Sequence, residues 1–384
     1  MEISLKGSTN NYTKKEEFMQ FARISARHCY SEHDWETLEK ETYNPDFVNG
    51  LIKGGHHSVF EHINLTFSMS GLPKIMAMIL NNEQLCATSE KSARYTQMKE
   101  IQPEQQKKYD KWLGIIHDKI SEIYPKNNFT NLYVKDKTGK TPAIKLAQEN
   151  ARYMTSVFTP TKMVHTLNLR QLNYVLDYMT GFILDYGETN EFNSRLAVEM
   201  IKFKDEIDDE FKIKGLVSQA DRHLSIFGKP VSEKFDETYA TNYKMSFASL
   251  AQAHRHRTIN YQISKDIELN APDGFHVPKI IRGTDFEKEW VSDLEEISKT
   301  DFPQAQLIDV TETGTLNDFR SKLILRLCGH AQHETMERTL ELAKKYAENY
   351  AKFNHEWLNP KCIQGMDCSG GCSLGSQRAL ERRI

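Results

Sequence analysis

The chain has 384 residues, enough for one large hydrophobic core or for two or three smaller ones. An apolar content of 39% and a charged content of 27% are typical of a soluble globular protein. A net charge of −3 excludes a global attraction to nucleic acid or to an anionic membrane, so any anion site has to be local. The longest apolar run, Ile75–Leu80, is too short to span a bilayer, and residues 1–20 carry no signal-peptide core, so we expect a cytoplasmic protein.

The first half of the chain alternates helical and strand patterns. The expected elements are a helix over 15–40, a strand over Ile63–Met69, a helix over Lys74–Leu85, a loop-rich insertion or lid over about 100–140, a helix from Pro142 to Arg152, a strand over Val157–Thr166, a helix that begins at Asn168 and a long helix over 188–212. A polar segment over 213–240, with two glycines and a proline, then marks a boundary between two halves.

The second half is expected to contain a helix over 285–298 and a long helix over Asp318–Phe353. In that long helix one broad face would carry Arg326, His330, His333, Glu334 and Glu337. A di-metal carboxylate site needs similar spacing, but no second helix carries a matching Glu-x-x-His.

The triplet Arg255-His256-Arg257 is the most unusual local pattern in the chain. Unpaired guanidinium groups are costly to bury, whereas their planar donors suit phosphate or carboxylate. The triplet therefore indicates a site for a large anion. A solvated basic turn is the alternative.

A second polar patch, Gly54–His62, contains three histidines, a serine and a glutamate and leads directly into the strand over Ile63–Met69. A polar loop next to a rigid strand is typical of a functional site. Two other interpretations stay open. The histidines could cap local backbone groups, or His56, His57, Glu61 and His62 could bind zinc, although adjacent ligands rarely converge on one ion.

Ser92 and Arg94 lie two residues apart and would point to one side of an extended or turn backbone. No His-Asp pair follows Ser92 at a recognisable position, so phosphate or base recognition is favoured over a nucleophilic serine.

The cysteines fall into two groups. The isolated ones, Cys29, Cys86 and Cys328, are expected to be buried thiols in a reducing cytosol. The other group, near the end of the sequence, consists of Cys362, Cys368 and Cys372. Together with His355 these cysteines could bind zinc or a metal cluster, or they could belong to a flexible Gly-rich thiol segment.

Taken together, these patches resemble the flavin-dependent thymidylate synthase family, the FAD enzymes that methylate dUMP. The family signature is Arg-His-Arg followed at set distances by Ser, Asn, Ser and Arg. It has His-x-Ser/Thr-x-x-Glu-His upstream, with Asn-x-Arg and His-Ala-Gln-x-Glu downstream. The first half matches with His56, Ser58, Glu61, His62, Thr66-Phe67, Glu90, Ser92, Arg94, Arg152, Asn168 and Arg170. The second half matches with Gln252, Arg255, His256, Arg257, Arg326, His330-Ala331-Gln332 and Glu334.

Each half also departs from the family pattern. The first half has Asn81-Asn82-Glu83 in place of the basic triplet and Met179 in place of an arginine. The second half places Ser264 one residue too early and has Thr315 and Asn317 at the Asn-x-Arg position. The losses are complementary, so the resemblance implies one composite site built from both halves.

The implied fold is of the α+β class. It would contain two tandem repeats, each a mainly antiparallel sheet packed with helices, which together form a pseudo-dimer. The expected domains are residues 1–213 with the insertion at about 100–140, residues 214–355, and a Cys/Gly-rich tail over 356–384. Because the family's enzymes are homotetramers with sites between subunits, we expect a homodimer that is a pseudo-tetramer.

The implied function is the reductive methylation of dUMP to dTMP, with FAD as the cofactor and with NADPH and methylenetetrahydrofolate as co-substrates. The implied catalytic residues are Ser92, Arg94 and Arg326. The implied substrate-binding residues are Gln252, Glu90, Arg94, Arg152, Arg255 and Arg326. The implied FAD-binding residues are His56, Ser58, Glu61, Arg255, His256, Arg257, Asn168 and Arg170. No metal, nucleic acid or membrane is implied. Ser92 could instead be a turn hydroxyl, and Asn168 could be a helix cap followed by a surface charge at Arg170.

Two rival functions remain. The site could transfer another one-carbon group, such as hydroxymethyl, to a pyrimidine nucleotide. The chain could also be a non-catalytic nucleotide-binding paralogue that retains only the fold.

Overall fold

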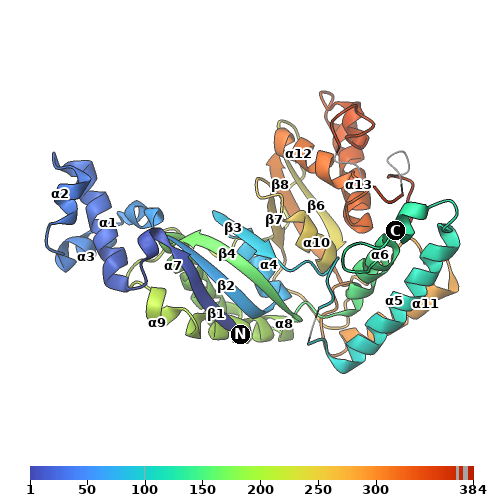
Figure 1. Ribbon diagram of the computed structural model, residues 1–384, viewed down its shortest axis with the longest axis horizontal. Helices are drawn as coiled ribbons and strands as arrows, with labels where there is room; N and C mark the ends of the chain where they lie inside the picture. Colours follow the sequence, from blue (N-terminus) through green and yellow to red (C-terminus); the bar gives the residue numbers. More distant parts are fainter. Residues whose placement is uncertain (99, 369–371, 375–378) are drawn as a thin grey trace. The chain divides into compact units, whose positions relative to one another are not determined.

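The computed structural model describes residues 1–98, 100–368, 372–374 and 379–384. The chain divides into two compact units, each discontinuous in sequence. Unit 1 comprises Met1–Lys91 and Pro160–Ser225, and unit 2 comprises Ser92–Thr159 and Ile226–Ile384. Each unit is built on a four-stranded antiparallel sheet packed with helices, so the protein is of the α+β class as expected (Figure 1). Among the described residues, no helix is both long enough and apolar enough to span a bilayer.

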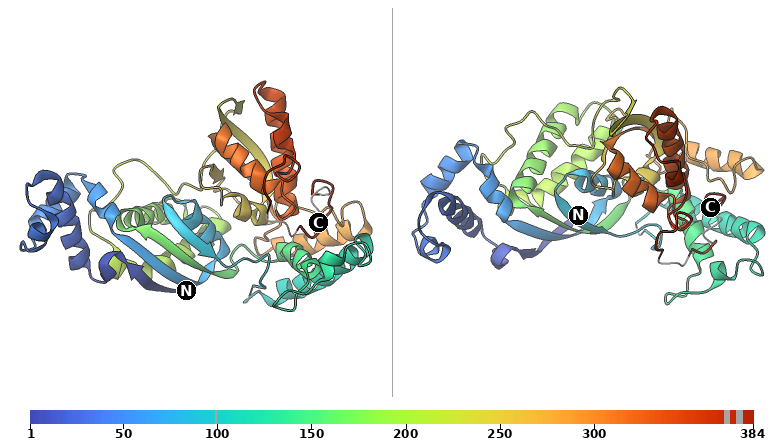
Figure 2. Two further views of the ribbon diagram at one scale, coloured as in Figure 1. Left: turned by 45° about the horizontal axis from the view of Figure 1, so that its top comes forward. Right: turned by 90° about the horizontal axis from the view of Figure 1, so that it is seen from above.

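Unit 1 has the strand order β1-β2-β4-β3. Its strands are β1 (Glu2–Ser8), β2 (Asn64–Pro73), β3 (Cys86–Glu90) and β4 (Pro160–Asn168). Its helices are α1 (Lys15–Tyr30), α2 (Trp35–Glu39), α3 (Pro45–Lys53), α4 (Lys74–Asn82), α7 (Leu169–Tyr186), α8 (Glu191–Asp205) and α9 (Asp208–Phe211), with 3₁₀ turns at Thr9–Asn11 and His57–His62. Helices α7 and α8 run across one face of the sheet (Figure 1; Figure 2, right).

Unit 2 has the strand order β5-β6-β8-β7. Its strands are β5 (Lys234–Phe235), β6 (Thr238–Ser246), β7 (Asn260–Ile263) and β8 (Leu307–Thr315). Its helices are α5 (Pro103–Ile123), α6 (Pro142–Ala151), α10 (Phe247–Ala253), α11 (Asp285–Ser298), α12 (Leu316–Arg326) and α13 (His333–Asn349), with 3₁₀ turns at Thr130–Tyr133, Arg152–Met154 and His355–Leu358.

The two sheets share one topology. In each, a long strand (β2 or β6) leads into a helix, a short strand follows, and a second long strand (β4 or β8) returns to pair with the first. Each returning strand ends at the N-cap of the next helix: Asn168 accepts a hydrogen bond from the backbone of Gln171 at 2.7 Å, and Thr315 accepts one from the backbone of Asp318 at 3.2 Å. Both caps satisfy amide groups that a helix start leaves unpaired.

The region expected as a loop-rich insertion is largely helical. Helix α5 buries Tyr109, Trp112, Ile116 and Ile120, whose spacing of three and four residues is that of one helix face. Trp112 packs edge-on against Trp290 of α11, with ring centroids 4.9 Å apart, and donates a hydrogen bond to Asp293 at 2.8 Å. This aromatic cluster places residues 92–159 in unit 2, next to the second half of the sequence.

Several predicted boundaries are wrong. The expected helix over Asp318–Phe353 is two helices, α12 and α13, because the chain leaves the helical path at 327–332. Within this linker a side chain at Gly329 would collide with the sulfur of Cys372. The expected helices over 15–40 and 188–212 are likewise each split in two, and the strand expected over Val157–Thr166 begins at Pro160.

Other predictions are confirmed. The helix over 285–298 is α11, the strand expected over Ile63–Met69 is the first part of β2, which begins at Asn64, and the helix from Pro142 is α6. The proposed domain boundary at 213/214 stays a prediction about sequence repeats. The isolated cysteines are less buried than expected, since Cys29 is exposed and Cys86 and Cys328 are half-buried.

Candidate functional site

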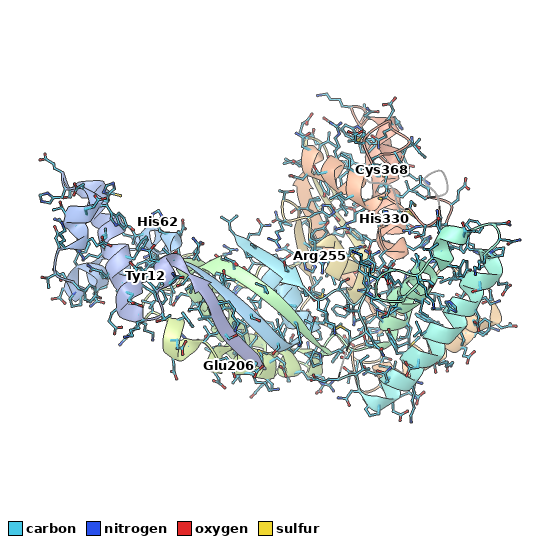
Figure 3. All side chains as sticks on the ribbon, viewed as in Figure 1. Tyr12, His62, Glu206, Arg255, His330 and Cys368 are labelled. Carbon is cyan, nitrogen blue, oxygen red and sulfur yellow. The ribbon has the colours of Figure 1, made fainter. Side chains whose placement is uncertain are left out.

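Unit 2 gathers arginines from both halves of the sequence. Arg94 lies in the turn after β3, Arg152 follows α6, Arg255 follows α10 (Figure 3), and Arg326 ends α12. They are close enough to interact electrostatically. Burial, together with the charges of Arg94 and Arg255, lowers the pKa of Arg326 to about 10, although nearby Tyr261 opposes the shift. Because that value is far above neutral pH, Arg326 keeps its charge and the cluster is a concentrated cationic site.

Arg94 is fixed in this cluster by two contacts. Its Nε donates to the Glu149 carboxylate, and its Nη2 donates to the backbone carbonyl of His330 at 2.7 Å. Burial is the largest single effect and lowers the pKa of Arg94, but Glu149, Tyr95 and Tyr153 together outweigh it, so the pKa is raised. Arg94 is therefore an oriented cation whose remaining N–H groups are available for an anion.

Arg152 is only 4% exposed and lies in a buried hydrogen-bond network. Its Nη2 donates to the side-chain oxygen of Gln332 and to the Ala248 carbonyl, the latter at 3.2 Å. The side-chain amide of Gln332 in turn donates to the hydroxyl of Tyr153, and Tyr153 donates to Glu334 at 2.5 Å. Burial lowers the pKa of Arg152, and Arg94 and Arg255 lower it further against the opposing effect of Glu149.

Gln252 connects the two sides of the cluster. Its side-chain oxygen accepts from the backbone N–H of Gln332 at 3.1 Å, and its backbone carbonyl accepts from Arg326 Nη2 at 3.0 Å. The residue is 7% exposed, so its orientation is determined by these contacts. The segment Gln332–Glu334 thus links Gln252 and Arg326 to Arg152.

Buried donors in this cluster lack an acceptor. Among the residues that the structure describes, Nε of Arg152, Nε of Arg326 and Nε2 of His256 are buried without a hydrogen-bond partner. Leaving such groups unpaired costs about 1–3 kcal/mol each. An anionic ligand with several oxygens would satisfy them, so the donor set fits a nucleotide better than it fits an apolar ligand.

His256 also provides a pH test. Burial first, and then the charges of Arg326 and Lys322, lower the pKa of its imidazole from its ordinary value of 6.5 to about 3. Between pH 3 and pH 6.5 the unfolded chain binds a proton at this imidazole that the folded chain does not bind. The contribution of His256 to the unfolding free energy is therefore complete above pH 6.5 and falls as the pH drops toward 3.

We therefore expect the ligand-free protein to lose about 1–2 kcal/mol of unfolding free energy at this site between pH 7 and pH 5. Urea titrations at the two pH values measure the loss. The His256→Gln variant serves as the control, because it removes the titrating group and should show a smaller difference. An equal difference in both proteins contradicts the assignment.

The predicted residues of unit 1 form a separate group. Arg170 makes an ion pair with Glu61 and lies over the ring of Tyr174, 5.0 Å from its centroid. Asn168 caps α7, as the structural alternative anticipated, and the side-chain nitrogen of Gln171 is buried without a partner among the described residues. His56, Ser58 and Glu61 lie on the exposed loop and 3₁₀ turn before β2.

Other predicted residues have more specific positions. Glu90 is buried in unit 1, paired with Lys74 and hydrogen-bonded to Asn81 at 3.2 Å. Ser92 begins the turn that carries Arg94, and its backbone carbonyl accepts from Thr96 at 3.0 Å. Arg255 is exposed and Arg257 is half-buried. The predicted roles of all these residues stay predictions.

The sequence interpretation missed the residues that support the arginines. Tyr153 directly follows Arg152, and Glu149 lies one helical turn before Tyr153, so adjacency was the available signal. No local signal indicated Arg382, which donates to the carbonyls of Gly329 and Ala331.

Neither metal interpretation gains support. In residues 1–98, 100–368, 372–374 and 379–384, no group of three or more His, Cys, Asp or Glu side chains could hold a metal ion. This part of the chain includes the His56–His62 loop and the cysteines Cys362, Cys368 (Figure 3) and Cys372, which are not in disulfides.

Comparisons with known proteins found a partial match to one family. Residues 11–181 match the family described as thymidylate synthase complementing protein. A flavin-dependent thymidylate synthase from Clostridium tetani is 28% identical over 160 residues, which are 38% of this chain and 64% of that protein. One from Thermococcus onnurineus is 26% identical over 191 residues, which are 46% of this chain and 71% of that protein. The crystal structure of thymidylate synthase X from Helicobacter pylori with FAD and dUMP is 17% identical, with a TM-score of 0.29, over 53% of this chain and 92% of the other.

The match thus spans somewhat less than two thirds of the Clostridium tetani protein's length. It covers the segment that carries the His-x-Ser-x-x-Glu-His, Ser-x-Arg and Asn-x-Arg patterns. Residues 11–181 are therefore similar to the flavin-dependent thymidylate synthase family.

Proposed function

We propose that this protein is a flavin-dependent enzyme that methylates dUMP to dTMP, with methylenetetrahydrofolate as the carbon donor and NADPH as the electron donor. The observation that carries the proposal is the cluster in unit 2, where Arg94 and Arg152 from the first half of the chain meet Gln252, Arg255 and Arg326 from the second. The relatives named above are flavin-dependent thymidylate synthases, and the Helicobacter pylori structure contains FAD and dUMP.

In this proposal the cluster is the nucleotide site. Arg94, Arg152 and Arg326 bind the dUMP phosphate and the uracil oxygens, where negative charge develops during transfer. Ser92 and Gln252 orient the nucleotide. Arg255 would complete the substrate-binding set in unit 2, and the family resemblance also assigns Glu90 to this set. Preorganised cations in a largely dry site stabilise developing charge without reorganising, and this is the main contribution of the protein.

Bound FAD would supply the redox chemistry that the carbon transfer needs. The residues that the family resemblance assigns to FAD are His56, Ser58, Glu61, Asn168, Arg170, Arg255, His256 and Arg257. The partnerless Gln171 amide next to Arg170 and the partnerless His256 nitrogen fit a polar cofactor. The shared topology of the two sheets supports the further proposal that the chain contains two tandem repeats, which together form a pseudo-dimer, and that two chains assemble as a homodimer.

We expect the purified protein to be yellow, with a flavin absorbance band in the visible blue, and to oxidise NADPH only when dUMP and methylenetetrahydrofolate are present. The measurements are the absorbance spectrum before and after addition of FAD, and the rate of NADPH oxidation with and without dUMP. No flavin absorbance after addition of FAD contradicts the cofactor assignment. NADPH oxidation that ignores dUMP contradicts the substrate assignment.

The mass of the product separates the remaining alternatives. A methylated nucleotide agrees with the proposal, and a hydroxymethylated one would replace it with the related transfer. A protein that binds dUMP without any turnover would be the non-catalytic paralogue.

A further inference from the structure

A second pocket in unit 2 adjoins the proposed nucleotide site. Its cavity volume is about 190 Å³. It shares Arg94 with the nucleotide site, but Arg152, Arg255 and Arg326 do not line it. The other walls come from helix α6, from Tyr95, Gly329 and His330, and from residues 373, 374 and 382, the last three of which belong to the segment outside the family pattern. The proposed function uses none of these walls, so the pocket needs its own explanation.

The pocket is positively charged. Arg94, Lys145 and Arg382 line it, against one acidic residue, Glu149, which already binds Arg94. Lys145 is also paired with Asp136, which is not among the lining residues. The buried Arg382 and the half-buried Arg94 therefore line the pocket with a single carboxylate between them, and an anion in the pocket would balance the remaining charge.

Arg382 is the most informative of these cations. It is only 3% exposed, its Nη1 donates to the Gly329 carbonyl at 2.6 Å, and its Nη2 donates to the Ala331 carbonyl. Its Nε is buried and has no hydrogen-bond partner among the described residues. A buried guanidinium held by neutral carbonyls and with one N–H unsatisfied is a donor that lacks its acceptor.

The rest of the pocket suits a flat ring. Tyr95 is 47% exposed, and its ring centroid lies 5.2 Å from the Arg94 guanidinium carbon and 5.8 Å from Lys145 Nζ. Leu146 and Leu374 add apolar surface. A cavity of about 150 Å³ is known to hold benzene, so this pocket has room for one aromatic ring but not for a dinucleotide.

We propose that this pocket is a subsite for an aromatic ring that carries a carboxylate. The ring packs against Tyr95 and the leucines, and the carboxylate accepts from Arg382 and Lys145. The one-carbon donor of the proposed reaction contains a benzoylglutamate group, which combines an aromatic ring with carboxylates. Naming this donor as the natural ligand of the pocket rests on the proposed function. The binding itself does not.

The test measures the equilibrium binding of three probes to the full-length protein by calorimetry. The probes are 4-aminobenzoyl-glutamate, which has ring and carboxylates, 4-aminobenzamide, which has only the ring, and inorganic phosphate, which has only the charge. We expect the first probe to bind at least tenfold more tightly than either of the others. The variants Arg382→Gln and Lys145→Gln should each weaken its binding about tenfold.

Arg383→Gln is the matched control, because Arg383 is the exposed neighbour of Arg382 and its loss removes the same charge. It should leave binding unchanged. Lys145→Gln keeps the test valid if Arg382→Gln disturbs folding, since Lys145 is half-buried on α6 and its contacts are with Asp136 and the exposed ring of Tyr95.

Three results would overturn the proposal: equal weakening by Arg383→Gln, no effect of Lys145→Gln, or phosphate binding that is as tight as that of the aromatic probe and is weakened by Arg382→Gln, which would place the phosphate in this pocket and not at the neighbouring arginine cluster. The outcome is separable from that of the proposed function. If the aromatic probe binds in the pocket but no dUMP-dependent turnover is found, the subsite is supported and the methylation is contradicted. If turnover is found but the probe does not bind, the methylation is supported and the subsite is contradicted.

Discussion

The Arg326→Gln variant should bind dUMP about 100-fold more weakly than the unchanged protein. Arg326 lies at the end of α12, donates to the Gln252 carbonyl at 3.0 Å, and has a buried Nε without a partner among the described residues. Truncating one member of a buried charge-assisted pair costs about 2–5 kcal/mol, and each 1.4 kcal/mol is a factor of ten. The dissociation constant of dUMP, measured by calorimetry, provides the check.

The control for this experiment lies on the same helix. Arg320 is exposed and packs over the ring of Trp357 at 5.1 Å, so Arg320→Gln removes the same charge far from the cluster's buried donors. We expect its dUMP affinity to stay within about twofold of the original, as is usual for an exposed charge. If both variants lose affinity equally, net charge and not the site determines binding.

The Glu334→Gln variant should lose about 2–4 kcal/mol of unfolding free energy. Glu334 is 1% exposed and accepts from the backbone N–H of Ser246 at 2.8 Å, from the Ser246 hydroxyl at 2.6 Å and from the Tyr153 hydroxyl at 2.5 Å. Burial first, and then Glu334, raise the pKa of Tyr153, so this hydroxyl remains a donor at neutral pH. An amide in place of the carboxylate would direct its own N–H groups at these donors.

Urea unfolding followed by tryptophan fluorescence measures the loss, because Trp112, Trp290 and Trp357 all lie in unit 2. Glu341→Gln on the same helix is the control, since the Glu341 side chain is 62% exposed and pairs with Arg338 on the surface. Equal midpoints for the two variants would mean that the carboxylate network is not structural. Because Tyr153 contacts Gln332, which holds Arg152, a weaker dUMP affinity is expected as well.

Strong local patterns predicted their elements well. The apolar spacing over 285–298 predicted α11, and the alternation over Ile63–Met69 predicted the first part of β2. Both succeeded because each element buries one face, and one buried face produces a clear apolar period in the sequence. The positions at which helices end or are interrupted were predicted less accurately. The helix expected over Asp318–Phe353 is interrupted around Gly329, since residues distant in sequence, including Cys372, occupy the space next to it.

The site divides in the same way. Arg255 was identified from the basic triplet, because guanidinium groups suit anions, whereas Arg94, Arg152 and Arg326 were assigned their roles through the family resemblance. The residues that contact and orient these arginines were not identified in the sequence. Tyr153, Glu149 and Arg382 carry no motif, and each acts through a partner at another place in the chain, as Arg382 does on Gly329 and Ala331.

The sequence alone indicated the resemblance to the flavin-dependent thymidylate synthases, the alternating helices and strands, and the arginines that could bind an anion, because motifs and hydrophobic periods are local properties of a chain. It did not indicate that residues 92–159 fold with the second half, which became visible in the three-dimensional structure. That choice depends on long-range packing, such as the contact of Trp112 with Trp290. The same packing brings Arg94 and Arg152 into the electrostatic range of Arg255 and Arg326, since burying large apolar surfaces outweighs the cost of crowding these charges.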